Sequence, residues 1–203
     1  MPGKKASEAE RREQILRAAR RVAMRDRLDG LTIRNVAREA EVSSGLVFFH
    51  YSTKDALLEA LLEWLLERTI VAEIGPDILR HETAVEQLLA LLEQELQRLS
   101  MHRDQLELFF DFWVIGRRDT TIRTMISQAL DRYRASFRPF AAAVIAQNPE
   151  RYADMTAEGL ALLVVSVIQG CAIQVIKDPN PIDLKPMLQT VYALLGRSDA
   201  VEV

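Results

Sequence analysis

The chain has 203 residues, of which 49% are apolar and 27% are charged, as is usual for a soluble globular protein. That length is enough for a small unit beside one larger hydrophobic core. A single cysteine, Cys171, excludes an intramolecular disulfide and suits a reducing cytoplasm, where we expect the protein to work. The first residues contain no apolar run, which predicts that they are not a secretory signal peptide.

Charge is distributed unevenly along the chain. Residues 1–54 carry 12 basic and 7 acidic side chains, a net charge of +5, whereas residues 55–203 carry 14 and 22, a net charge of −8. A basic segment beside an acidic one is expected when only one end of a protein meets phosphate groups. Ordinary solvated surface produces the same pattern, so charge alone does not decide between these explanations.

Residues 7–27 are expected to form the first helix, with arginines crowding the sides that are not apolar. Lys4 and Lys5 precede it in an arm that is suited to following a DNA backbone. The loop at residues 27–30 ends the helix, and Gly30 is free there to take a positive φ. The apolar stripe of this helix consists of Ile15, Leu16, Ala19, Val22 and Ala23.

Residues 31–58 predict two short helices joined by a tight turn and followed by a longer helix. Apolar residues at three- and four-residue spacing mark the first, and Thr32 is placed to cap it. Ser43 or Ser44 can cap the second, where Gly45 sits at a position that would push a side chain into a neighbouring surface. This is the geometry of a helix-turn-helix, whose second helix lies in the DNA major groove.

The helix-turn-helix residues resemble those of the TetR family of transcriptional repressors. The resemblance is strong over residues 8–66, and beyond residue 66 it is limited to the helical architecture. Glu41 replaces the usual turn glycine, so a position that is often left-handed is held without glycine. Phe48 replaces a tyrosine whose hydroxyl in the family meets a phosphate, and Tyr51 replaces a phenylalanine in a packing role. The matching positions are Thr32, Ala37, Ala40, Val42, Ser43, Gly45, Phe48, His50, Tyr51, Lys54 and Leu57–Leu58.

The resemblance implies a set of DNA contacts. Arg34 can reach a guanine, since a guanidinium is the usual bidentate partner of its O6 and N7 atoms, or it is an exposed helix arginine. Lys54 resembles the phosphate-contacting lysine of the family, and His50 either donates to a phosphate or packs in the small core. The expected contacts are Thr32, Arg34, Ser43, Ser44, Gly45, Leu46, Phe48, Phe49, His50 and Lys54.

The remaining chain is predicted to be all helix, which makes an all-α protein of about nine helices. A connecting helix over residues 54–74 would span about 30 Å, and Pro139 predicts a kink or break near Ser136 in a later helix. We expect a three-helix DNA-binding domain at residues 1–54 and a ligand-binding and dimerisation domain at residues 55–203. The later helices are predicted at residues 83–99, 103–116, 119–147, 156–177 and 183–196.

The helix predicted at residues 156–177 is apolar on nearly all sides. It approaches membrane-spanning length, but polar residues interrupt it and it lacks basic or aromatic flanks, so we do not expect a membrane protein. A helix apolar all round must be covered all round. In the TetR family the last two helices of each subunit form a four-helix dimer interface, which implies a homodimer here. The expected interface residues are Val167, Gly170, Ile173, Leu188 and Tyr192.

Residues 106–113 hold the densest aromatic cluster of the chain. Phe109, Phe110 and Trp113 share one face, which is either plain core or part of the ligand cavity that the family encloses among its body helices. With Trp64 they are the expected ligand contacts, and the inducer is expected to be apolar or weakly polar. Asp111 suggests a cage for a cation, but its helical spacing places it on a solvated stripe.

No catalytic or cofactor motif accompanies these features. The three histidines lack metal-ligand spacing, Cys171 shows no sign of activation, and no glycine-rich phosphate loop is present. We therefore expect a ligand-responsive repressor, without metal or cofactor, released from a palindromic operator by a small molecule. The alternative is a small-molecule binding or interaction protein of the same fold that has lost specific DNA binding, which Phe48 and Glu41 motivate.

Overall fold

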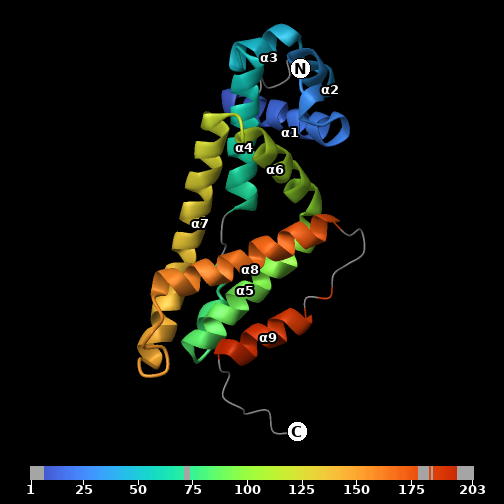
Figure 1. Cartoon of the computed structure of the whole chain (residues 1–203). Coiled ribbons are helices and arrows are strands. Elements are labelled where there is room, and N and C mark those ends of the chain that lie inside the picture. The colour runs from blue at the N-terminus through green and yellow to red at the C-terminus, as the bar shows by residue number, and fades with distance from the viewer. Residues whose placement is uncertain (1–6, 71–73, 178–182, 184, 196–203) are drawn as a thin grey trace, which may run out of the picture. The chain divides into compact units, whose positions relative to one another are not determined.

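The computed structural model describes residues 7–70, 74–177, 183 and 185–195, and these residues form nine α-helices and two short 3-10 turns without a strand (Figure 1). The all-α prediction is therefore confirmed. The lysines of the expected N-terminal arm and the loop before the last helix lie outside the described residues. Packing divides the chain into two compact units, one of Met1–Thr69 with Glu107–Ser127 and one of Ile70–Leu106 with Gln128–Val203. The expected functional boundary at residue 54 is a different kind of division and stays a prediction.

The first unit contains the connecting helix and the helices of the predicted DNA-binding domain at residues 1–54, which we call the head. Helix α1 packs on α2 and α4, and α2 packs on α3. A capping box begins α1, in which the Ser7 hydroxyl accepts from the Glu10 amide (3.2 Å) and the Glu10 carboxylate accepts from the Ser7 amide (2.7 Å). The elements of this unit are α1 (Glu8–Asp26), the turn η1 (Leu28–Gly30), α2 (Ile33–Glu39), α3 (Ser44–His50), α4 (Lys54–Thr69), the later part of α6 (Arg103–Gly116) and the start of α7 (Thr120–Gln147).

The loop after α1 differs from the prediction in where it bends. Arg27 has φ 60° and ψ 175°, a conformation that favours glycine, whereas Gly30 is not in the positive-φ region. A Cβ atom on Gly30 would lie 2.5 Å from Cβ of Asp26. The prediction for Gly30 was therefore wrong: this glycine is required because the Asp26 side chain lies against it, and Arg27 has the positive φ.

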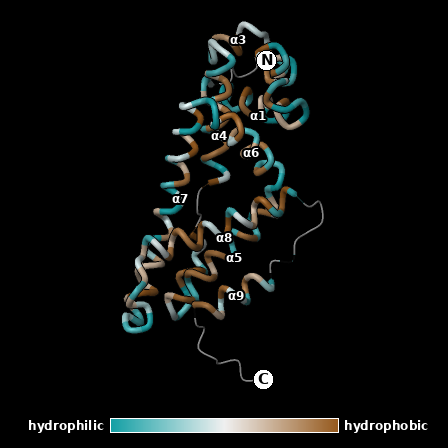
Figure 2. Tube along the Cα trace, in the orientation of Figure 1, coloured by the Kyte–Doolittle hydropathy of each residue, from teal (hydrophilic) through white to brown (hydrophobic). Residues whose placement is uncertain are grey.

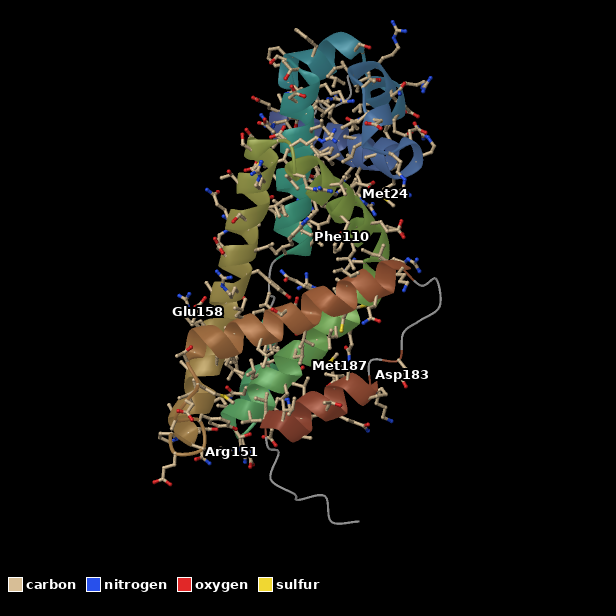
Figure 3. All side chains as sticks on the ribbon, in the orientation of Figure 1. Met24, Phe110, Arg151, Glu158, Asp183 and Met187 are labelled. Carbon is tan, nitrogen blue, oxygen red and sulfur yellow. The ribbon has the colours of Figure 1, made fainter. Side chains whose placement is uncertain are left out.

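The second unit is built around α5. It contains the turn η2 (Ile78–Arg80), α5 (Ala84–Met101), α8 (Ala157–Lys177) and α9 (Lys185–Leu195), with the remaining parts of α6 and α7. Figure 1 shows α8 and α9 lying along α5, and both helices contact it. Glu158 at the start of α8 (labelled in Figure 3) pairs with Arg134 (3.0 Å) and Arg138 (2.7 Å) of α7.

Helix α7 continues through Pro139, so the break that this proline predicted does not occur. Proline lacks an amide hydrogen, which removes one helix hydrogen bond in this turn. The Ser136 hydroxyl donates to the Tyr133 carbonyl at 2.6 Å in the same region. The aromatic rings of Tyr133 and Phe137 pack edge to face, with centroids 5.1 Å apart, and both side chains are buried. These contacts lie within α7 in the turns before Pro139, and the helix remains continuous.

Candidate functional site

The turn between α2 and α3 has the predicted caps. The Thr32 hydroxyl accepts from the Asn35 amide (3.1 Å) and the Ser43 hydroxyl accepts from the Leu46 amide (3.2 Å), so Ser43 and not Ser44 caps α3. Glu41 has φ 56°, which confirms that the turn is left-handed at this position without a glycine. The two helices are therefore joined as a helix-turn-helix requires.

Helix α3 turns one side into the unit and the other to solvent. Val47 is fully buried, whereas Phe48 and Phe49 are 58% and 78% exposed. A Cβ atom on Gly45 would meet nothing closer than the Ser43 hydroxyl at 3.9 Å. The space beside Gly45 is open within the described residues, so the neighbouring surface expected at this position is not one of theirs. Ser43, Ser44 and Gly45 are exposed, and Leu46 and His50 are half-buried.

Basic side chains flank this surface. Arg34 and Arg38 are exposed on α2, and Arg38 donates to the Asn35 side chain at 3.3 Å. Lys54 is exposed at the start of α4 and its ammonium group donates to the Asp29 carbonyl at 3.3 Å. This contact holds Lys54 beside the start of its helix, where a phosphate would also be stabilised by the helix dipole.

Several arginines of α1 are occupied within the unit. Glu39 of α2 accepts hydrogen bonds from Arg21 (2.7 Å) and Arg25 (2.9 Å), and these bonds hold the pKa of its carboxyl below the ordinary value. The Gln14 side chain donates to the Ala40 carbonyl at 2.7 Å. Helix α1 thereby orients α2, and through α2 the exposed helix α3.

Glu13 joins α1 to α4. Its carboxylate accepts from the indole N–H of Trp64 (2.8 Å) and from Arg17 (2.8 Å) and lies 3.4 Å from Arg68, whose guanidinium is 4.2 Å from the centre of the Trp64 ring. Burial alone would raise the pKa of Glu13, but the hydrogen bonds from Arg17 and Trp64 and the charge of Arg68 together lower it. Trp64 is thus a packing partner of α1, and its expected contact with a ligand stays a prediction.

The aromatic cluster of α6 lies within the first unit. The Phe109 ring centre is 5.6 Å from that of Phe110 and 5.9 Å from that of Trp113, and Phe110 (labelled in Figure 3) stacks with Trp113 at 6.4 Å. Phe109 is buried, whereas Trp113 is 44% exposed. Asp111 pairs with Arg27 at 3.3 Å, so this carboxylate already has a cationic partner.

A buried polar cluster in the second unit was missed by sequence reasoning. Glu95 is 3% exposed and accepts from the Tyr133 hydroxyl (2.8 Å) and from Arg98 (2.9 Å). Burial, and then the negative charge of Glu95, raise the pKa of Tyr133 far above its ordinary value, so its hydroxyl stays protonated and donates. The signal was present, because Glu95 lies three residues after Leu92 and four before Leu99, on the apolar stripe of α5.

Helix α8 buries one side and exposes the other. Leu162 and Leu163 are 47% and 56% exposed, Ile173 is 55% exposed, and Gly170 is exposed with no atom within 4 Å of its would-be Cβ. Val167 is half-buried. In Figure 2 much of α8 is coloured as hydrophobic, with paler and hydrophilic positions between. On α9, Leu188 and Tyr192 are half-buried and Leu194 is 71% exposed.

Helix α8 is also long and apolar enough to cross a membrane by length and composition alone. Its most apolar window has a mean hydropathy of 2.2, and 44% of that window is buried within the protein. A helix of a soluble core has the same properties. Among the described residues, no three histidine, cysteine or acidic side chains are grouped so that they could hold a metal ion.

Two family models match the chain and together cover most of it. Residues 15–61 match the bacterial regulatory proteins of the tetR family, and residues 84–198 match the C-terminal domain of the BetI-type transcriptional repressors. The chain therefore belongs to the TetR family and carries a BetI-type C-terminal domain. Members of this family are soluble transcriptional regulators and not enzymes, and they bind operator DNA and small molecules and act as dimers. The protein is a ligand-responsive, DNA-binding transcriptional regulator.

Individual relatives agree with this assignment. The transcriptional regulator BetI of Cronobacter sakazakii is 25% identical over 86% of this chain and 84% of its own length. The nicotine-responsive transcriptional repressor HdnoR of Paenarthrobacter nicotinovorans is 23% identical over 86% and 88%. A regulator from Saccharomonospora viridis, solved in complex with choline, has the same fold with a TM-score of 0.69, at 24% identity over 94% of this chain and 98% of that one.

Proposed function

We propose that the protein is a homodimeric repressor that leaves a palindromic operator when a small molecule binds to residues 55–203. The observation that carries this proposal is the surface of α3, which presents exposed apolar and small side chains, while the helices before and after it carry the exposed basic residues Arg34 and Lys54. Phosphate contacts position such a protein, and the side chains between them face the bases. We expect it to work in the cytoplasm, where operator DNA is accessible.

The proposed dimer contact is the exposed side of α8, together with α9. Leucine and isoleucine side chains left half-exposed on one line of a helix favour burial against a second surface. A two-fold axis would place the same side of α8 from each subunit face to face. Gly170 supports this choice, since a missing side chain lets two helix backbones approach closely.

We propose that the ligand contacts Phe109, Phe110 and Trp113 and is uncharged or weakly polar. The exposed part of Trp113 provides an aromatic surface, while Asp111 is paired with Arg27 and is not free to hold a cation. The relatives that respond to nicotine or bind choline suggest amines as the alternative, because cations also bind aromatic faces. A panel of neutral aromatic compounds and of tertiary and quaternary amines separates these two classes.

Sequence-specific DNA binding is tested by selecting, from a pool of random DNA duplexes, those that the full-length protein binds. Two heads related by two-fold symmetry should enrich a palindrome whose half-sites lie about one helical turn apart, or slightly more. Enrichment of a single, non-repeated site would contradict the palindromic operator. If no sequence is enriched above salt-sensitive background, the alternative of a binding protein without specific DNA recognition is favoured.

The test of ligand response is Trp113→Ala. A compound that releases the native protein from its operator should no longer release this variant, while DNA affinity without ligand stays within a few-fold of native, because a ligand shifts an equilibrium only through contacts that differ between the two states. Val114→Ala, which changes a 65% exposed neighbour on α6, is the control and should respond normally. Loss of DNA binding by the tryptophan variant without ligand would instead make Trp113 a structural residue.

A further inference from the structure

Phe49 on α3 is the most exposed aromatic side chain of the described part of the first unit. Phe48 beside it is also more than half exposed, so two large apolar side chains face solvent on a helix of seven residues. Among the described residues, Phe49 meets the ring of His50 edge to face, with the ring centres 5.2 Å apart. An exposed pair of this kind marks a binding surface.

The helical geometry places Phe49 and Gly45 together on the outermost line of α3. Each residue turns about 100°, so Gly45 and Phe49 lie about 160° and about 200° round the helix from the buried Val47. The two residues therefore point to the same side of α3, and no Phe49 side-chain atom lies within 4 Å of the position that a Gly45 Cβ would take, so the backbone at Gly45 stays open beside the ring. Phe49 supplies an apolar side chain, and Gly45 supplies an open backbone surface next to it.

No packing contact among the described residues explains the glycine at position 45. Its would-be Cβ atom has open space around it, and glycine inside a helix is less stable than alanine. A glycine at such a position is explained when an outside surface must approach the backbone closely. The helices before and after α3 carry exposed positive charge, Arg34 on α2 and Lys54 at the start of α4, so the surface that fits is duplex DNA.

The chemistry of the major groove then selects a base. Its edges carry hydrogen-bond donors and acceptors at every base pair, and the C5-methyl group of thymine is the apolar feature among them. A phenyl ring has no hydrogen-bonding group to offer a polar base edge. We propose that Phe49, with Gly45 allowing close approach, reads thymine methyl groups in each half-site. This inference rests on the proposed function, since it assigns specificity within the DNA-reading surface.

The test removes the methyl groups without changing any hydrogen bond. Each thymine of the selected operator is replaced singly by deoxyuridine, and the affinity of the full-length protein is measured at fixed salt. Loss of one buried methyl group should weaken binding about fourfold, and loss from both half-sites about 15-fold. Phe49→Ala should bind the thymine operator as weakly as the native protein binds the uracil operator, and should no longer distinguish the two.

Two variants serve as controls. Phe48→Ala removes the neighbouring ring from the flank of α3 and should keep the preference for thymine over uracil. Leu79→Ala removes a 61% exposed apolar side chain from the second unit and should leave DNA affinity unchanged. Gly45→Ala should raise the melting temperature and weaken operator binding by at least tenfold, which separates an effect on DNA approach from a folding defect.

Three results would overturn the assignment. Binding that is indifferent to uracil at every position would show that methyl groups are not read. A thymine preference retained by Phe49→Ala would assign the reading to another side chain. A Phe49→Ala defect that is equal on thymine and uracil operators would make Phe49 a contact to the backbone or a wedge between bases. Failure of selection itself would instead reject the proposed function, and that outcome is seen before any uracil is introduced.

Discussion

Two residues of the head hold backbone conformations that favour glycine. Glu41 in the turn before α3 has φ 56°, and Arg27 after α1 has φ 60°. A left-handed conformation costs a residue with a Cβ atom about 1–2 kcal/mol. The hydrogen bond from the Val42 amide to the Ala37 carbonyl (3.0 Å) closes the turn around Glu41 and offsets part of that cost.

Glu41→Gly should raise the free energy of unfolding by about 0.5–1 kcal/mol, because relief of the strained φ exceeds the extra entropy that glycine adds to the unfolded chain. Urea unfolding followed by circular dichroism measures this change. Glu63→Gly, at an exposed position inside α4, is the matched control, and its free energy of unfolding should fall by about 1 kcal/mol. An unchanged or lower stability for Glu41→Gly would mean that the turn is not left-handed in solution.

Arg34 and Lys54 should differ in how they affect DNA binding. Arg34→Ala should cost about 1–3 kcal/mol and relax the preference at one base pair, since a guanidinium reads guanine through two hydrogen bonds. Lys54→Ala should weaken binding to all DNA sequences alike, and it should reduce the slope of log affinity against log salt concentration by about one. Titrations on the selected operator and on single-base variants, at several salt concentrations, distinguish the two. A uniform loss for Arg34→Ala would make it a phosphate contact.

At the scale of elements, α1 is the part of the head that places the others. Arg21 and Arg25 hold α2 through Glu39, while Glu13 holds α4 through Trp64 and Arg68. Exposed ion pairs each contribute little to stability. The Glu13 carboxylate, however, also accepts from the nearly buried indole of Trp64, and this holds it in place more firmly than an ion pair alone. We therefore expect α1 and α4 to move as one piece when the orientation of α3 changes.

Glu13→Gln tests this connection through its dependence on pH. The folded-state pKa of Glu13 is lowered from its ordinary value of 4.5, so its contribution to stability is fully present above that pH and is lost as the pH falls through the folded-state pKa. The variant should be less stable than native by about 0.5–1 kcal/mol at pH 7, and the difference should shrink toward pH 3.5. Urea unfolding at both pH values measures it, with the exposed Glu63→Gln as control. A difference that is constant with pH would show that the charge of Glu13 is not what holds α4.

At the scale of the whole molecule, we expect dimerisation and DNA binding to be coupled. If the operator is palindromic as proposed, a single head meets one half-site and two heads held by one interface meet both, so loss of the dimer should remove most of the operator affinity. Substitutions on the exposed apolar side of α8 are therefore expected to weaken both dimerisation and DNA binding.

Gly170→Asp should give monomers or aggregates, because a charge would be buried in the proposed interface. The fold of each subunit should survive, since the space at position 170 is open. Light scattering at micromolar concentration and circular dichroism measure both effects, and Gln97→Asp on the exposed side of α5 is the control. A variant that stays dimeric would place the interface elsewhere.

The sequence by itself determined the elements of this protein because helix formation depends on local features. The apolar spacing placed the first helix within one residue at each end, and Thr32 and Ser43 cap α2 and α3 as the sequence predicted for Thr32 and for Ser43 or Ser44. The family resemblance also indicated the left-handed turn at Glu41. Propensity, capping and periodicity act over a few residues, so they can be read without knowing the fold.

Only the tertiary structure decided which side chains meet. The partner of Trp64 on α1, the pairing of Arg27 with Asp111, and the grouping of residues 107–127 with the first unit all join segments far apart in the sequence. Burial of Glu95 depends on Tyr133 reaching it from α7, and the roles of Gly30 and Gly45 depend on what lies beside them. Such contacts depend on how the helices pack, which local periodicity does not specify, and this is why the helices were predictable while their contacts required the structure.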